Sequence, residues 1–161
     1  CWWQLDAERY AVRAARGDLD GIMDETPDGL STARRQLKAC VEEALHQADL
    51  GYAQLHIGGF SQGAMVTTDL ALRLEEAPAS LTIMSGALIC RPEWARKAAG
   101  RAGLRVLQSH GRGDMLLPMP LALSLRGLLE DAGLNVEFIE FSGGHGVPPE
   151  VIEALASLIS D

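Results

Sequence analysis

The chain has 161 residues, of which 47% are hydrophobic and 22% are charged, a composition typical of a folded domain and not of a disordered segment. Its formal net charge is −8 and its basic residues do not cluster, which argues against a nucleic-acid backbone as partner. No apolar run approaches the roughly 18 residues that a membrane span needs. At about 150 residues per domain, the length predicts one domain over residues 1–161.

The cysteines and the first residues bear on the cell compartment and on the extent of the chain. Cys1, Cys40 and Cys90 are odd in number and form no C-x-x-C pair, which excludes a disulfide framework and a zinc site of that type. Unpaired thiols suit a reducing compartment, so we predict a cytoplasmic location. The first residues form no basic and apolar leader, and the chain opens at Cys1 rather than at Met. We therefore expect either processing or the C-terminal portion of a longer domain.

The first half of the chain begins with an irregular stretch and continues with regular elements. Turn residues at 18–21 and 26–29 predict an irregular connection over the first thirty residues. Ser31 is then expected to cap a helix that runs to about Asp49. A buried strand is predicted over 54–60, followed by a helix from Gln62 to about Glu76 that Pro78 stops.

The second half alternates strands with helices. Short apolar stretches predict strands over 81–84, 104–109 and 136–141. A helix over about 121–131 is expected to end at Gly133, and a last helix is expected to begin at Pro148-Pro149. This alternation predicts an α/β fold with a mostly parallel sheet flanked by helices.

The strongest chemical motif is a G-x-S-x-G pattern at residues 59–63, Gly-Phe-Ser-Gln-Gly. It lies between a predicted strand and a predicted helix, where a strained turn exposes the hydroxyl of Ser61 as a nucleophile. The backbone N–H of Gln62, at the start of the helix, can point at a developing oxyanion. The alternative is a glycine-rich turn with an incidental serine.

Asp114 and His145 each follow a predicted strand, in segments 110–114 and 143–146. The carboxyl ends of parallel strands share one edge of a sheet, so these two side chains are expected to converge with Ser61. The chain order Ser, Asp, His is that of α/β-hydrolases and differs from the orders in chymotrypsin and subtilisin. The pattern therefore predicts a Ser-His-Asp triad.

Three segments resemble motifs of the phospholipase/carboxylesterase family, which includes the acyl-protein thioesterases. They are residues 57–65, residues 108–118 and the Gly-Gly-His at 143–145, and the similarity runs from about Trp2 to the C-terminus. The resemblance implies an α/β-hydrolase fold that cleaves carboxylic esters or acyl thioesters with no metal and no other cofactor. It assigns the triad to Ser61, Asp114 and His145, and one oxyanion N–H to Gln62.

Family members begin with further strands and with a loop that supplies a second oxyanion N–H. Nothing ahead of Trp2 supplies these parts here, so we expect a sheet that lacks its N-terminal strands and an unpaired edge that favours a homodimer. An alternative function is therefore that of a catalytically impaired fragment acting as a binding or oligomerisation module. A peptidase or lipase on the same fold is a further alternative, although the chain has no long lid typical of a lipase.

Four apolar side chains are candidates for lining an acyl groove near the nucleophile, or else for merely capping the fold: Trp94, Met115, Leu116 and Leu117. His110 is expected to position the aspartate loop. The four histidines share no ligand spacing, so no metal site is predicted. The expected partner is a small-molecule or acylated ester or thioester substrate, with neither nucleic acid nor a membrane span involved.

Overall fold

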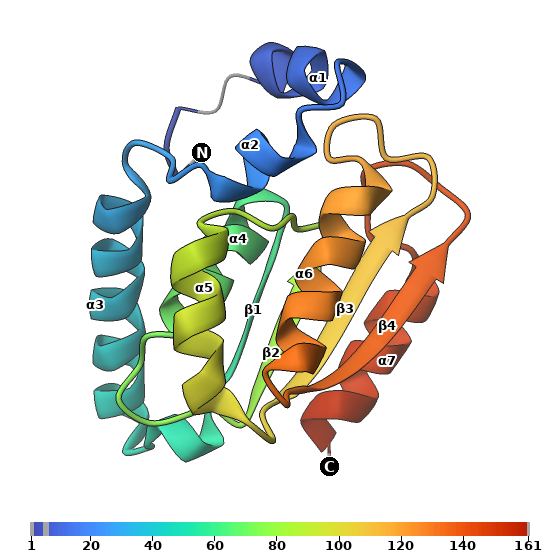
Figure 1. The fold of residues 1–161 in the computed structure, drawn as a ribbon. Helices are drawn as coiled ribbons and strands as arrows, with labels where there is room; N and C mark the ends of the chain where they lie inside the picture. Colours follow the sequence, from blue (N-terminus) through green and yellow to red (C-terminus); the bar gives the residue numbers. More distant parts are fainter. Residues whose placement is uncertain (1, 5–6, 161) are drawn as a thin grey trace.

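A computed structural model describes residues 2–4 and 7–160 of the chain. Its four strands form one parallel sheet in the order β1-β2-β3-β4 (Figure 1). The strands are β1 (His56–Phe60), β2 (Ser80–Met84), β3 (Arg105–Gly111) and β4 (Asn135–Phe141). Because all four strands run the same way, their carboxyl ends lie along one edge of the sheet, as predicted.

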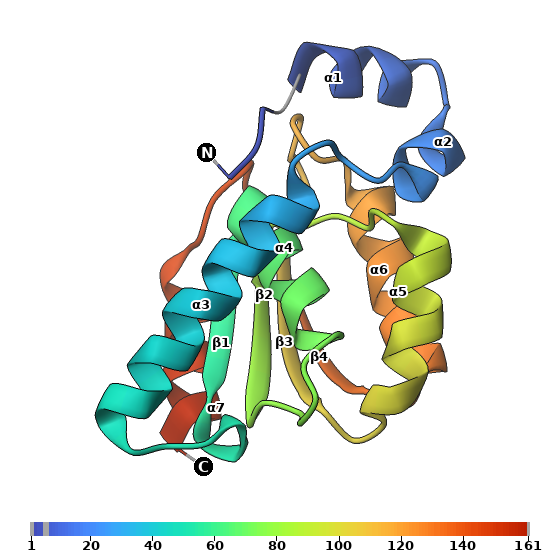
Figure 2. The same cartoon turned by 90° about the vertical axis from the view of Figure 1, so that its left-hand side faces the viewer.

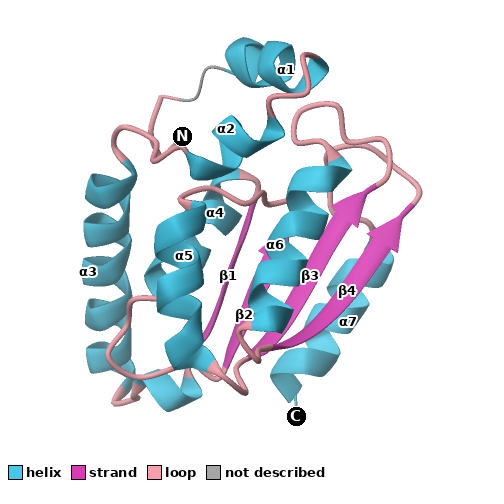
Figure 3. Ribbon diagram, viewed as in Figure 1, coloured by secondary structure: helices cyan, strands magenta, loops and turns pink. Residues whose placement is uncertain are grey.

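Seven α-helices and two 3₁₀ turns are present in the described residues. They are α1 (Ala7–Ala15), α2 (Leu19–Asp24), α3 (Leu30–Ala48), η1 (Tyr52–Gln54), α4 (Gln62–Ala71), α5 (Arg91–Ala98), η2 (Ala99–Arg101), α6 (Met119–Asp131) and α7 (Pro149–Ser160). Helices α4, α5 and α6 lie on one side of the sheet and α7 lies on the other, while α3 packs against α4 beside β1 (Figures 1 and 2). The result is a three-layer α/β arrangement, which Figure 3 shows by element type.

Burial differs between the central and outer strands. In β3 every residue from Val106 to Gly111 is buried, and β2 is buried from Ser80 to Ile83. In β1 buried Ile57 lies between exposed residues, and β1 pairs only with β2 within the described part of the chain. The centre of the sheet is therefore buried, and β1 and β4 are its outer strands among the described residues.

The first thirty residues are not an irregular connection, as the sequence had suggested, because they contain α1 and α2. The turn residue Asp18 caps α2, its Oδ1 accepting the N–H of Gly21 at 3.1 Å. Ile22 and Met23 of α2 are buried, and Arg91 of α5 pairs with Asp24. Figure 1 shows both helices beyond the carboxyl edge of the sheet.

Other element boundaries also differ from the prediction. Gly29, and not Ser31, is the N-cap of α3. Gln54 belongs to η1, because its backbone N–H donates to the carbonyl of Gly51 at 3.2 Å, and its side chain accepts the N–H of Gly51. Helix α4 ends at Ala71, about one turn before the predicted end, where the guanidinium of Arg101 donates to the freed carbonyl of Ala71 at 3.0 Å.

Helix α5 was not predicted at all, although its segment carries helix signals. These are a proline in its first turn, Glu93 near its start, and Arg96 and Lys97 in its last turn. Within the described residues, no helix combines the length and the apolar character needed to cross a bilayer.

Candidate active site

Ser61 occupies the tight turn between β1 and α4. Its φ of 56° and ψ of −121° are a strained conformation for a residue with a side chain, and its N–H donates to the carbonyl of Met84 at 2.8 Å. The turn requires glycine at position 59, because a Cβ there would lie 2.4 Å from the carbonyl of Gly63. The backbone thus carries Ser61 at the carboxyl edge of the sheet.

Ser61, His145 and Asp114 form one hydrogen-bonded chain. Nδ1 of His145 lies 2.7 Å from Oδ2 of Asp114, and Nε2 lies 2.8 Å from Oγ of Ser61. An ionised carboxylate only accepts, so Nδ1 carries the proton and Nε2 accepts from the hydroxyl. The ring of Phe60 packs on the imidazole with centroids 4.8 Å apart. The structure therefore brings together the three side chains predicted from sequence.

Asp114 is buried and its carboxylate is fully engaged. Oδ1 accepts the backbone N–H groups of Leu116 and Leu117, both at 2.9 Å, while Oδ2 faces His145. These bonds fold the chain after β3 into a turn around the carboxylate. The orientation of Asp114 is consequently set by its own loop.

His110 lies directly behind this loop, with no exposed surface. Its Nε2 donates to the carbonyl of Leu117 at 2.7 Å and lies 3.4 Å from Oδ2 of Asp114. Burial lowers the pKa of His110, so the neutral imidazole with its proton on Nε2 is favoured. His110 thus contacts the loop that carries Asp114, the loop that we expected it to position.

The loops that carry Asp114 and His145 are joined to each other. The N–H of Gly113 donates to the carbonyl of Gly143 at 2.8 Å. A Cβ on Gly111 would lie 2.3 Å from the carbonyl oxygen of Gly144, so the two loops touch through their backbones. The acid and the histidine are therefore held as one unit.

Gln62 has two separate contacts with its surroundings. Its backbone N–H belongs to the first turn of α4, where N–H groups have no acceptor within the helix. Its side chain is buried and holds the segment at residues 2–3, accepting the N–H of Trp2 at 2.7 Å and donating to the carbonyl of Trp3 at 2.9 Å. Sequence reasoning had missed this side-chain role, because nothing local in the sequence links positions 60 residues apart.

The predicted acyl-groove residues divide into two pairs. Trp94 has no exposed surface and donates its indole N–H to Asp69 at 2.9 Å, and Leu117 is buried in the core, so both predictions were wrong. Met115 and Leu116 are 82% and 50% exposed beside Asp114. A separate hollow of about 610 Å³ opens beside the nucleophile on the β1 side. Its lining residues are Trp2, Leu37, Gly58, Gly59, Phe60, Ser61, Gln62, Gly63 and Thr67.

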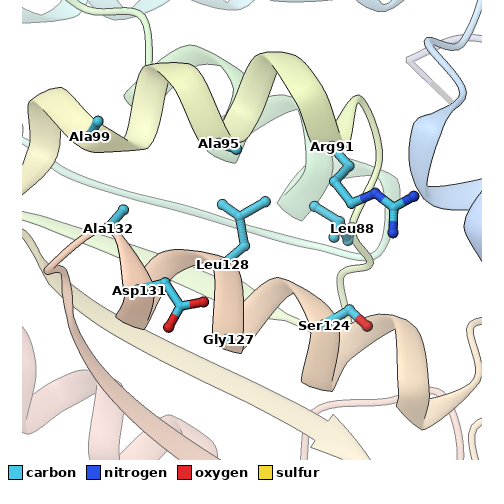
Figure 4. Close-up of a pocket in the computed structure, with 9 residues that line it drawn as sticks. All are labelled: Leu88, Arg91, Ala95, Ala99, Ser124, Gly127, Leu128, Asp131 and Ala132. Atoms are coloured by element: carbon cyan, nitrogen blue, oxygen red, sulfur yellow. The ribbon is translucent and has the colours of Figure 1, made fainter.

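A second hollow, of about 590 Å³, lies between α5 and α6 (Figure 4). It is lined largely by small side chains, and Arg91 at its end points toward α2, where it pairs with Asp20 and Asp24. Ser124 and Asp131 also line it, without a histidine among the lining residues. This groove therefore lacks the base that a serine nucleophile needs.

The sequence is similar to those of known proteins. A family model described as Phospholipase/Carboxylesterase matches residues 14–161. The chain is 22% identical to acyl-protein thioesterase 1 of Neurospora crassa, over 94% of this chain and 64% of that protein.

Solved structures show the same fold. Esterase PE8 is 26% identical with a TM-score of 0.75, covering 82% of this chain and 61% of that one. SOBER1 from Arabidopsis thaliana is 19% identical with a TM-score of 0.73, covering 84% of this chain and 65% of that one. The sheet and helices thus form an α/β-hydrolase fold, and the chain spans somewhat less than two thirds of the length of these relatives. From the match over residues 14–161, the chain belongs to the phospholipase/carboxylesterase family.

Proposed function

We propose that the protein is a serine hydrolase that cleaves carboxylic esters or acyl thioesters through an acyl-enzyme, with Ser61, His145 and Asp114 as its triad. The observation that carries this proposal is the pair of hydrogen bonds at His145, 2.8 Å to Oγ of Ser61 and 2.7 Å to Asp114. Nucleophile, base and orienting acid then lie in the required order and within reach of one another.

In the first half-reaction, Oγ of Ser61 attacks the acyl carbon while Nε2 of His145 takes the hydroxyl proton. The imidazolium that results faces the carboxylate of Asp114, which keeps Nδ1 protonated throughout. When the tetrahedral intermediate collapses, His145 returns the proton to the departing alcohol or thiol. Ser61 is left as an acyl ester.

In the second half-reaction, water attacks the acyl carbon and gives a proton to Nε2 of His145, which passes that proton to Oγ of Ser61 as the carboxylic acid leaves. The negative oxygen of both intermediates needs donors close to the nucleophile. The N–H of Gln62 is the donor that we assign, because it follows Ser61 at the start of α4. Met115 and Leu116, exposed beside the acid loop, are the remaining candidates for contacting the acyl chain.

The substrate class follows from the chemistry and from the relatives. A thioesterase is found among the sequence relatives and an esterase among the structural ones. A small-molecule or acylated ester or thioester fits both names, because each has an acyl carbonyl and a leaving group that His145 can protonate.

The deciding experiment is covalent labelling of the full polypeptide with a fluorophosphonate, which requires an activated serine and little substrate recognition. We expect the label on Ser61, and Ser61→Ala is expected to lose p-nitrophenyl ester turnover by on the order of 10⁴–10⁶-fold. Ser157→Ala, at an exposed serine on α7, is the matched control. A folded wild-type protein that takes no label, or a Ser61→Ala variant with undiminished turnover, would refute the proposal.

The open edge of β1 favours a second candidate, self-association through that edge. Phe60 and Ile159 are 39% and 49% exposed, and Ile159 and Leu155 of α7 line a hollow along β1. Unpaired strand edges readily accept another strand. Sedimentation velocity should then show a dimer that Ile159→Lys dissociates and that Leu123→Lys, at an exposed position on α6, leaves intact. A monomeric wild-type protein would exclude this candidate.

A further inference from the structure

Ser85 follows the last residue of β2, at the same edge of the sheet as Ser61. The side chain is fully buried, and its N–H donates to the carbonyl of Ser109 at 2.8 Å. Its hydroxyl donates to the carbonyl of Gly146 at 3.1 Å. Gly146 is the residue after His145, so this one hydroxyl connects the end of β2 to the loop of the candidate base.

The backbone of Ser85 is in the left-handed region, with a φ of 47°. Residues with a Cβ adopt this region at a cost in free energy, and glycine adopts it freely. A serine in this strained and fully buried position supplies a group that glycine lacks. The group that it supplies here is the hydroxyl.

The loop that receives this hydroxyl is rich in glycine. Gly143, Gly144 and Gly146 surround His145, and glycines have the largest conformational freedom to lose. Two hydrogen bonds hold the backbone on the two sides of His145: Gly113 N–H to the carbonyl of Gly143, and the Ser85 hydroxyl to the carbonyl of Gly146. The first bond comes from the loop after β3 and the second from the end of β2.

We infer that Ser85 is a positioning residue that fixes the His145 loop, so that Nε2 stays within hydrogen-bond distance of Ser61. This inference rests on the proposed function, because the position of His145 matters for turnover only if His145 is the base. Without the hydroxyl, one side of the loop is released while the Asp114 side stays attached. The imidazole can then turn about its bond to Asp114 and away from Ser61.

The test uses Ser85→Ala and Ser85→Gly in the full polypeptide, because the two variants share the lost hydroxyl and differ in backbone strain. Both are expected to lose kcat by roughly 10²-fold, the order expected when a reacting group moves by about 1 Å, with KM unchanged. Ser85→Gly should melt at a higher temperature than Ser85→Ala, because alanine keeps the strain. The loss of turnover should therefore be the same in both variants, because both lack the hydroxyl. Their melting temperatures should differ, because only alanine keeps the strain.

A second readout does not depend on turnover. Hydrogen exchange of the amides at 142–147 should be faster in both variants than in the wild-type protein. Ser80→Ala is the control, since it removes a buried hydroxyl at the other end of β2 that bonds His56, and it should leave this loop unchanged.

Wild-type kcat in Ser85→Gly, unchanged exchange in the loop, or a Ser85→Gly protein that fails to fold would each overturn the inference. So would a loss of kcat in proportion to the loss of stability, because that pattern indicates a structural role alone. The wild-type protein could also take no fluorophosphonate label while both variants still show faster exchange in the loop. In that case the proposed chemistry is wrong, and the role of the Ser85 hydroxyl in holding the loop is supported.

Discussion

The strands that precede Asp114 and Ser61 have contrasting surroundings. β3 lies between β2 and β4 and is buried from Val106 onward, whereas β1 pairs with β2 alone among the described strands and exposes Phe60. The acid and the histidine lie on two loops that are joined by the Gly113–Gly143 hydrogen bond and by the close approach of Gly111 to Gly144. The nucleophile is held by the geometry of one turn. Half of the candidate site is thus preorganised by packing, and the other half by local backbone conformation.

After replacement of the nucleophile itself, the largest expected effect comes from the acid that follows the buried strand β3. Asp114→Asn keeps an oxygen that can accept from Leu116 and Leu117, so the loop should stay folded, but its amide can donate to Nδ1 and impose the wrong tautomer on His145. We expect kcat to fall by about 10³–10⁴-fold with little change in thermal stability. Steady-state kinetics on an ester, with the remote Asp131→Asn as control, measures this. A loss of only a few-fold would show that Asp114 does not orient the base.

The contact between the two loops is tested by adding one methyl group. Gly111→Ala would place its Cβ 2.3 Å from the carbonyl oxygen of Gly144, whereas a Cβ on Gly146 meets nothing within 4 Å. We expect Gly111→Ala to lower the free energy of unfolding by about 1–3 kcal/mol, as overpacking does, and Gly146→Ala to leave it nearly unchanged. Urea denaturation of both variants checks the pair. Equal stability would show that the loops do not depend on this close approach.

The smallest effect concerns pH and the buried His110. Burial lowers its pKa below the ordinary value of 6.5, so below that pH the unfolded state binds a proton that the folded state resists. The free energy of unfolding should therefore fall as the pH is lowered from 6.5 toward the folded-state pKa. His110→Gln, which keeps a donor near the position of Nε2, should remove this part of the acid destabilisation.

The matched control for this titration is His46→Gln, on the surface of α3. Denaturant curves between about pH 7 and 5 compare the three proteins. A wild-type slope that His110→Gln leaves unaltered would assign the acid sensitivity to other groups.

The sequence was sufficient to predict the parallel sheet and the convergence of the three polar side chains. Each prediction rested on local evidence: an apolar strand, a glycine-rich turn after it, and the rule that parallel strands end at one edge. The strands β2, β3 and β4 accordingly differ from their predicted ranges by one or two residues.

What the sequence did not reveal depends on partners distant along the chain. Trp94 looks like an acyl-groove residue until its bond to Asp69, 25 positions earlier, places it in the core. The hydroxyl of Ser85 meets a carbonyl 61 positions later. The short helices α1 and α2 were missed because their turn residues, such as Asp18, serve as helix caps as readily as they form loops.

The hydrogen bonds that join the Gln62 side chain to Trp2 and Trp3 have a consequence for the fluorescence of the protein. The three tryptophans differ sharply in exposure, with Trp2 at 41%, Trp3 at 6% and Trp94 at 0%. A water-soluble quencher such as acrylamide should therefore reach the fluorescence of Trp2 first. Because Trp2 also lines the hollow beside Ser61, its emission offers a dye-free signal for molecules that enter there, while Trp94 reports separately on unfolding of the core.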